Sequence, residues 1–194
     1  MKQNPTNIFK GILLLTIGIV ILSGQNGEKI ELKAGDPAPT FYLRDLDNAD
    51  FFLRDYCGEE LRQPWKHREK QVIILSFFAT WCQPCRQEIP LLHEIKEKYR
   101  DENLKIYLID VGEKKDLVRK FVSQQNYKLP ILLDIYSMVS AKKYGVYSLP
   151  HLFVIDKNGI IVLNKKGFHD KESFMRKMDS TLHVVLPEYT VTKP

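Results

Sequence analysis

The residues from Val72 to Phe78 (VIILSFF) form an unbroken run that is apolar except for one serine and rich in β-branched and aromatic side chains. Such a run is typical of a central strand that is buried on both faces of a sheet. It leads almost directly into Trp81–Cys85 (WCQPC), and apolar side chains then recur at helical spacing as far as Tyr99. The sequence therefore predicts a strand, a short turn and a helix that begins at Cys82 and reaches about Asp101.

The rest of the folded region alternates between strand and helix patterns. A lead-in hairpin is expected over residues 41–53, and the turn at Asn158 and Gly159 predicts a second hairpin. Further strands are expected over 104–111, 131–134, 152–155 and 160–163, and helices over 114–126, 137–144 and 171–182. This order predicts an α/β fold whose mixed central sheet is parallel in the middle and antiparallel at the edge, with helices on both faces. Ligand chemistry on such sheets lies beyond the carboxyl ends of the strands, where Cys82 is placed.

The N-terminal segment 11–22 (GILLLTIGIVIL) is apolar apart from one threonine. It is shorter than the roughly 20 residues that a membrane-spanning helix needs, and its length fits the hydrophobic region of a signal sequence. The residues on either side lengthen it enough to cross a thin bilayer, and those that follow offer only a weak cleavage site. An uncleaved anchor is therefore favoured, and a cleaved signal that leaves a secreted or periplasmic protein is the alternative.

We expect four regions: a membrane anchor or signal segment over 1–24, a linker over 25–34, a folded domain over 35–185 and a C-terminal tail over 186–194. Lys2 and Lys10 precede the apolar segment. The positive-inside tendency then keeps the N-terminus in the cytoplasm and places the folded domain outside the cytoplasmic membrane. Disulfide chemistry is common in that compartment.

Charge and cysteine content narrow the classes of function. The formal net charge of +5 comes from basic residues scattered among acidic ones, as in Glu94–Lys98, so nucleic-acid binding is not expected. Three cysteines are too few for a disulfide-stapled scaffold, and two of them form one Cys-x-x-Cys. That spacing indicates either redox chemistry or half of a metal site.

A dithiol at Cys82 and Cys85, in the first turn of a helix, places two sulfurs on one face within bonding reach. The helix N-terminus favours the thiolate of Cys82, the expected solvent-facing nucleophile, and Cys85 is the expected resolving thiol. Gln83 and Pro84 carry no charge, so the couple is expected to be reducing to intermediate. Glu88 lies on the face of Cys85, where it either exchanges the proton of Cys85 or is an ordinary exposed glutamate. No cofactor is expected beyond the redox-active disulfide.

The stretch from Phe77 to Pro90 (FFATWCQPCRQEIP) resembles the active-site signature of the TlpA/ResA-type thiol-disulfide oxidoreductases. These are thioredoxin-fold proteins held outside the cytoplasmic membrane. Residues 35–41 and 147–156 are similar to that family's opening segment and to its cis-proline loop with the next strand. The resemblance implies a thioredoxin-like three-layer fold with the hairpin as an N-terminal extension.

The resemblance also implies roles for individual residues. Glu88 falls on the family's active-site glutamate. Pro150 is expected to be cis and to lie against the cysteines, and Leu149 to present its backbone to an extended substrate peptide. With Trp81, these two residues form the expected substrate-binding set.

Some positions depart from the family pattern. Ser76 stands where cytosolic thioredoxins have a buried aspartate. His151 replaces a small hydroxyl residue after the proline, and either tunes the thiolate or is simply packed or solvated. Cys57 is expected to be an inert thiol. The loop over 56–71 is longer than expected for the family and is a candidate for partner selection.

The expected function is reduction of disulfides in exported proteins, with the haem-attachment cysteines of apocytochrome c as a family-level candidate and a membrane thiol donor as the source of electrons. One alternative is an oxidase or isomerase of secreted proteins. A thiol peroxidase is a second, although Ala79 occupies the place where that chemistry wants a hydroxyl residue. Copper or zinc binding by the two thiols is a third.

Overall fold

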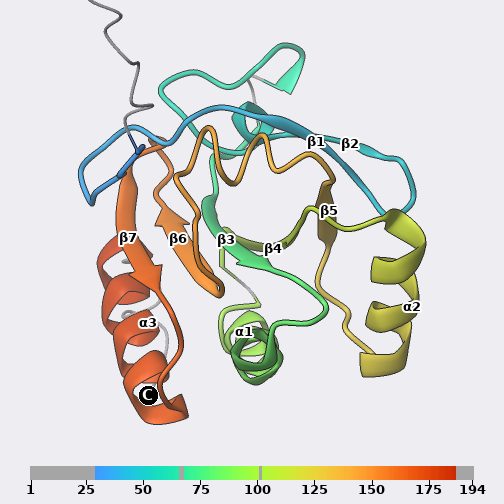
Figure 1. The fold of residues 1–194 in the computed structure, drawn as a ribbon. Helices are drawn as coiled ribbons and strands as arrows, with labels where there is room; N and C mark the ends of the chain where they lie inside the picture. The colour runs from blue at the N-terminus through green and yellow to red at the C-terminus, as the bar shows by residue number, and fades with distance from the viewer. Residues whose placement is uncertain (1–28, 66–67, 101, 187–194) are drawn as a thin grey trace, which may run out of the picture.

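The computed structural model describes residues 29–65, 68–100 and 102–186, which form one seven-stranded sheet with three α-helices (Figure 1). The strands are β1 (Tyr42–Asp45), β2 (Asp50–Phe52), β3 (Val72–Phe78), β4 (Leu104–Val111), β5 (Ile131–Asp134), β6 (His151–Ile155) and β7 (Ile161–Lys166). The helices are α1 (Gln83–Lys98), α2 (Lys115–Gln125) and α3 (Lys171–Val185), and η1 (Leu53–Asp55) is a 3-10 turn. No helix in this part of the chain is long and apolar enough to cross a membrane. The anchor or signal segment predicted over 1–24 lies outside the described residues, as does all but the first residue of the predicted tail.

The strands lie in the order β2-β1-β5-β4-β3-β6-β7. The three central strands β5, β4 and β3 are parallel, whereas β6 and β7 on one side and β1 and β2 on the other pair in antiparallel fashion. The predicted α/β class, mixed sheet and lead-in hairpin are therefore confirmed, and the hairpin adds a second antiparallel edge. Every residue of β3 is buried, as its continuous apolar run predicts.

All three α-helices pack on the same face of the sheet. Their buried side chains, among them Ile89 of α1, Phe121 of α2 and Phe174 of α3, belong to one core cluster that also contains both cysteines of the motif. A second cluster fills the opposite face, beneath the β1–β2 hairpin, η1 and residues 139–146. The first turn of α1 is thus built into the core.

The helix predicted over 137–144 is a series of turns. The carboxylate of Asp134 accepts hydrogen bonds from the backbone N–H groups of residues 138–140, and Ser137 has a left-handed backbone with a φ of 53°. Ala141 and Lys143 donate their N–H groups to carbonyls four residues earlier, as in a helix, but Tyr144 donates to the carbonyl of Val139, five residues earlier, so no continuous series of helical bonds forms. The second face is therefore covered by turns and by η1, and α-helices cover one face where both were expected.

The lead-in segment lies along the outer edge of β7. The N–H of Gly35 donates to the carbonyl of Ile161 at 2.8 Å, and the N–H of Ile161 donates to the carbonyl of Asp36 at 2.9 Å. The side-chain amide of Asn164 donates to the carbonyl of Leu32 at 2.6 Å. At the opposite edge of the sheet, β2 is only three residues long.

Candidate dithiol active site

Cys82 caps the N-terminus of α1. Its backbone is extended (φ −76°, ψ 101°), and its Sγ accepts a hydrogen bond from the N–H of Cys85 at 3.3 Å. Pro84 lies in the first turn, where a missing N–H leaves no helical hydrogen bond unmade. The two cysteines form a disulfide, with their Cα atoms 5.3 Å apart. The helix start predicted at Cys82 is confirmed.

Both sulfurs are buried in the disulfide form. Cys82 is 3% exposed and Cys85 is 1% exposed. The expectation that Cys82 faces solvent is therefore wrong for this oxidised state, because its sulfur is bonded to Cys85 and packed in the core cluster. Solvent reaches the motif at Trp81, which is 70% exposed, and at Gln83, which is also exposed.

Glu88 lies one turn beyond Cys85 and is 1% exposed. The hydroxyl of Ser76 on β3 donates to its Oε1 at 2.9 Å. Its Oε2 has no hydrogen-bond partner among the described residues and lies 3.9 Å from Nζ of Lys165 on β7. Burial raises the pKa of this carboxyl from 4.5 to about 7, against the smaller opposing effects of Ser76 and Lys165. A carboxyl with such a pKa can take and release a proton at neutral pH, and its burial excludes the exposed-glutamate alternative.

Thr80, the residue before Trp81, is hydrogen-bonded to a carboxylate from outside the motif. Glu113 accepts hydrogen bonds from the N–H and the hydroxyl of Thr80 at 2.6 and 2.7 Å. Arg86 on α1 donates to the carbonyl of Thr80 at 3.2 and 2.6 Å. Glu113 follows β4, the parallel neighbour of β3, so the rule that ligand chemistry gathers beyond the carboxyl ends of strands could have identified it.

Asp110, near the end of β4, is a second buried carboxyl beside this loop. Its Oδ1 accepts the N–H of Glu113 at 3.2 Å, and its Oδ2 has no hydrogen-bond partner among the described residues. Burial, followed by the neighbouring carboxyl of Glu113, raises the pKa of Asp110 from 3.8 to about 8. A protonated Asp110 avoids repulsion with Glu113 and leaves Glu113 free to hold Thr80.

The peptide bond between Leu149 and Pro150 is cis, as the resemblance implied. The half-buried Leu149 packs against the core cluster that contains both cysteines, and the carbonyl of Pro150 accepts the N–H of Gly167 at 2.8 Å. This loop leads into β6, which pairs antiparallel with β3. It therefore lies at the same edge of the sheet as the end of β3 that leads to Cys82.

His151, the first residue of β6, is buried, and one of its two ring nitrogens has a hydrogen-bond partner among the described residues. Its Nε2 lies 2.7 Å from Oδ1 of Asn164, whose Nδ2 donates to the carbonyl of Leu32. Because an amide oxygen only accepts, Nε2 carries the proton, and Nδ1 has no hydrogen-bond partner among the described residues. Burial lowers the pKa of His151, and its ring stacks on Phe153 with centroids 4.7 Å apart. These contacts favour the packed, neutral reading of this histidine.

Large apolar side chains are exposed around the active-site edge. Trp81 follows β3, Tyr136 and Met138 follow β5, and Tyr147 precedes β6. These connections all lie at the edge where the parallel strands end and the antiparallel β6 begins. Exposed apolar groups gathered in one region are typical of a surface that binds a partner.

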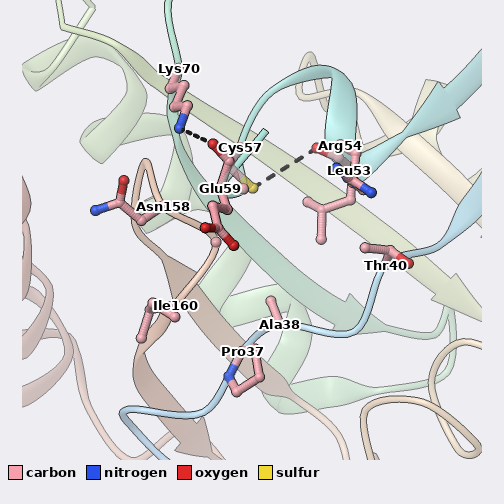
Figure 2. A pocket seen from close by; sticks show the side chains of 12 residues that line it. Pro37, Ala38, Thr40, Leu53, Arg54, Cys57, Glu59, Lys70, Asn158 and Ile160 are labelled. Carbon is pink, nitrogen blue, oxygen red and sulfur yellow. Dashed lines mark hydrogen bonds between the residues drawn. The ribbon is translucent and has the colours of Figure 1, made fainter. Parts of the chain in front are cut away.

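Cys57 is a free, buried cysteine in the loop after η1. Its Sγ lies 3.9 Å from the carbonyl of Leu53, and it lines a cavity of about 540 Å³ together with Glu59 and Lys70 (Figure 2). Burial raises the pKa of the Cys57 thiol to about 12. Such a thiol is protonated at neutral pH, which agrees with the expected inert cysteine.

A disulfide that closes the first turn of a helix, with a titratable carboxyl buried one turn below it, has the parts that thiol-disulfide exchange requires. Together with a mixed sheet of this strand order, such a site defines a thioredoxin-type thiol-disulfide oxidoreductase. Among the described residues, no three His, Cys, Asp or Glu side chains converge to form a metal site.

Similar sequences identify the family. The sequence model of the AhpC/TSA family matches residues 34–164. The thiol-disulfide oxidoreductase ResA of Bacillus cereus is 31% identical over 176 residues, which cover 89% of this chain and 94% of that protein. ResA of Geobacillus thermodenitrificans is 32% identical over 184 residues, which cover 93% of this chain and 98% of that protein. The chain belongs to the AhpC/TSA family and, within it, to the ResA-type thiol-disulfide oxidoreductases.

Solved structures support the fold. The crystal structure of a thiol:disulfide interchange protein assigned as DsbE, from Chlorobium tepidum, matches with a TM-score of 0.66 at 28% identity and covers 78% of this chain and 99% of that one. StoA from Bacillus subtilis matches with a TM-score of 0.56 at 20% identity, covering 74% of this chain and 98% of that one, and bears on the fold alone. The thioredoxin-like fold implied by the resemblance is confirmed.

Proposed function

We propose that this chain reduces disulfides in exported proteins, with Cys82 as the attacking thiol, Cys85 as the resolving thiol and Glu88 as the proton acceptor. The observation that carries the proposal is the buried carboxyl of Glu88, one turn below Cys85, whose pKa is raised to about 7. A buried thiol must lose its proton before it attacks, and a carboxyl that titrates near neutral pH suits that task.

In the first half of the reaction, the thiolate of Cys82 attacks one sulfur of the substrate disulfide. A bond forms between Cys82 Sγ and that sulfur, the substrate S–S bond breaks, and the first substrate thiolate leaves and takes a proton from water. The positive end of α1 favours the attacking thiolate. So does the N–H of Cys85, which points at Cys82 Sγ in the oxidised state.

In the second half, the proton of Cys85 passes to the carboxylate of Glu88, and the Cys85 thiolate attacks Cys82 Sγ. The enzyme disulfide forms, the mixed disulfide breaks, and the second substrate thiolate leaves and is protonated by Glu88. Two electrons have then moved from the dithiol to the substrate. The enzyme is left in the oxidised state that the structure represents.

The proposed substrate-binding residues are Trp81, Leu149 and Pro150. The backbone before the cis-proline would pair with an extended substrate peptide, in the manner of an added strand. The exposed apolar side chains at this edge, including Tyr136 and Tyr147, support a polypeptide as the substrate.

The proposed direction is reduction, because Gln83 and Pro84 place no charge between the cysteines. The proposed place is outside the cytoplasmic membrane, where residues 1–24 would anchor the chain or be cleaved as a signal. Exported proteins would be the substrates, with the haem-attachment cysteines of apocytochrome c as the first candidate. A membrane thiol donor would restore the dithiol after each turnover.

A trapping experiment tests the mechanism and identifies the substrate. Cys85→Ser in the full chain keeps the attack and removes the resolution, so the substrate should accumulate as a mixed disulfide with Cys82. Cys82→Ser is the matched control and should trap nothing. Disulfide reduction by Cys82→Ser at the wild-type rate would show that the mechanism is wrong.

The redox potential of the couple distinguishes the direction. A value well below about −200 mV marks a reductant, and a value near about −120 mV marks an oxidant. Peroxide turnover by Cys85→Ser would instead favour a thiol peroxidase. Copper or zinc bound to the purified, reduced chain would favour the metal-binding alternative.

A further inference from the structure

Lys165 is a largely buried cation that lies against Glu88. Its Nζ is 3.9 Å from Oε2 of Glu88, the oxygen of that carboxyl with no hydrogen-bond partner among the described residues. The Lys165 side chain is 17% exposed and that of Glu88 is 1% exposed. Lysines are seldom buried unless they are paired, so the contact requires an explanation.

The register of the sheet brings the two groups together. Ser76 of β3 lies opposite Leu152 of β6, and Leu152 lies opposite Lys165 of β7. Residues paired across strands share a face, so Ser76 and Lys165 flank Leu152 on the face that α1 covers. The Glu88 carboxyl reaches between them, with Oε1 hydrogen-bonded to Ser76 and Oε2 toward Lys165.

The ammonium group of Lys165 is held by other protein groups as well. It donates to the carbonyl of Gly167 and lies 5.8 and 5.2 Å from the ring centroids of Phe168 and Phe174. Carbonyl and aromatic groups stabilise a cation but carry no charge. Burial lowers the pKa of Lys165, and Glu88 is the one charged group among the described residues that opposes this shift. In the same part of the chain, Lys165 is the one charged group that shifts the pKa of Glu88.

We propose that Lys165 is a positioning residue that keeps Glu88 ionised often enough at neutral pH to take the proton of Cys85. This inference rests on the proton-transfer role proposed for Glu88. Burial favours the neutral carboxyl, and the cation 3.9 Å away favours the carboxylate. Without Lys165, Glu88 would already hold a proton at pH 7, and the Cys85 thiol would lack an acceptor as the Cys82–Cys85 bond forms.

Titration of the Glu88 carboxyl tests the first part of the inference. Carbon-13 NMR of the full, oxidised chain, in which neither cysteine of the pair titrates, measures its midpoint. Lys165→Met should raise that midpoint by about one pH unit or more, the usual effect of losing an opposite charge nearby. Lys165→Arg keeps the charge and should restore the midpoint. Lys166→Met, which removes the neighbouring lysine paired with Glu31, is the matched control and should leave it unchanged.

The rate at which the mixed disulfide is resolved tests the second part. In single-turnover reduction of a disulfide-bonded peptide at pH 7, Lys165→Met should resolve about fivefold more slowly. The reason is that, at pH 7, a rise of about one pH unit in the midpoint of Glu88 lowers the ionised fraction of its carboxyl from about one half to about one tenth. The loss should disappear at about pH 9, which a structural defect would not produce. In a Glu88→Gln chain, Lys165→Met should cause no further loss.

The outcomes separate the two proposals. An unchanged Glu88 midpoint in Lys165→Met and in Lys165→Gln overturns the role of Lys165 and leaves the role of Glu88 intact. If the midpoint of Glu88 rises but the rate of mixed-disulfide resolution is unchanged at every pH, the roles of both Lys165 and Glu88 are overturned, because Glu88 would not then be the proton acceptor. Lys165→Gln is the second neutral variant, so a folding defect of the methionine variant does not prevent the test.

Discussion

Replacing Glu88 with glutamine should make the free energy of unfolding less dependent on pH. Burial raises the pKa of Glu88 from 4.5 to about 7, so the folded chain holds this proton more tightly than the unfolded chain does. The stability that the protonated carboxyl contributes is therefore complete below pH 4.5, falls as the pH rises toward 7, and is lost above about pH 8.

The size of the effect follows from the two pKa values. At about 1.4 kcal/mol per pH unit, the interval from 4.5 to about 7 corresponds to about 3 kcal/mol. Glutamine has nearly the same shape and can still accept the Ser76 hydroxyl, but it does not ionise. It also leaves Lys165 without its counter-ion at the pH values where Glu88 is ionised, an effect that the pKa of about 7 already includes. As the pH rises from acidic to mildly alkaline, the free energy of unfolding of the variant should therefore increase by about 3 kcal/mol relative to that of the wild type.

Urea unfolding of the oxidised chains, followed by far-UV circular dichroism at several pH values from about 4.5 to 8.5, measures this difference. The two proteins share every other titratable group, so subtracting their curves isolates Glu88. Parallel curves over the whole range would refute the reasoning, because they would mean that folding does not change the pKa of Glu88.

Three further predictions concern two groups near the site and one group away from it. Asp110→Asn removes a carboxyl whose pKa is raised to about 8 by burial. As the pH rises from acidic values to 9, the unfolding free energy of the variant, measured by the same urea method, should therefore increase by at least about 1 kcal/mol relative to that of the wild type. Glu113→Ala removes two hydrogen bonds to Thr80 and should lower the unfolding free energy by about 1–3 kcal/mol. Hydrogen exchange at the Thr80 amide should become faster, and an unchanged exchange rate would contradict the role of Glu113 in holding Thr80. Cys57, whose pKa is raised to about 12 by burial, should not react with Ellman's reagent in the folded, oxidised chain at about pH 8, and one thiol per chain should react after denaturation.

The strands were predictable where the pattern is local. The buried run of β3 and the alternating β1–β2 hairpin carry their own signals, and the structure places them where those signals indicate. The helix predicted over 137–144 is wrong because the backbone bonds of that segment do not repeat at four residues: Tyr144 donates to Val139, and Ser137 has a left-handed backbone. Apolar spacing does not reveal how these backbone groups are bonded.

The site was predictable along α1 and not across the sheet. Helical spacing places Cys82, Cys85 and Glu88 in successive turns, so the sequence alone brings them together. It leaves the exposure of Glu88 open, because that depends on which face of α1 packs on the sheet. Lys165 reaches Glu88 only through the register of β3, β6 and β7, and strand register is a tertiary property that no local motif encodes.

The protection of the sheet edges has a consequence for substrate selection. An unfolded polypeptide can add as a strand to any free sheet edge. Here β2 offers three residues at one edge, and the segment that contains Gly35 and Asp36 occupies backbone groups of β7 at the other. Within the described part of the chain, an extended polypeptide therefore finds few strand edges to pair with, which leaves less competition for the proposed substrate-binding loop at Leu149 and Pro150. Closing the edges would in this way raise the share of encounters that bring a substrate disulfide to Cys82.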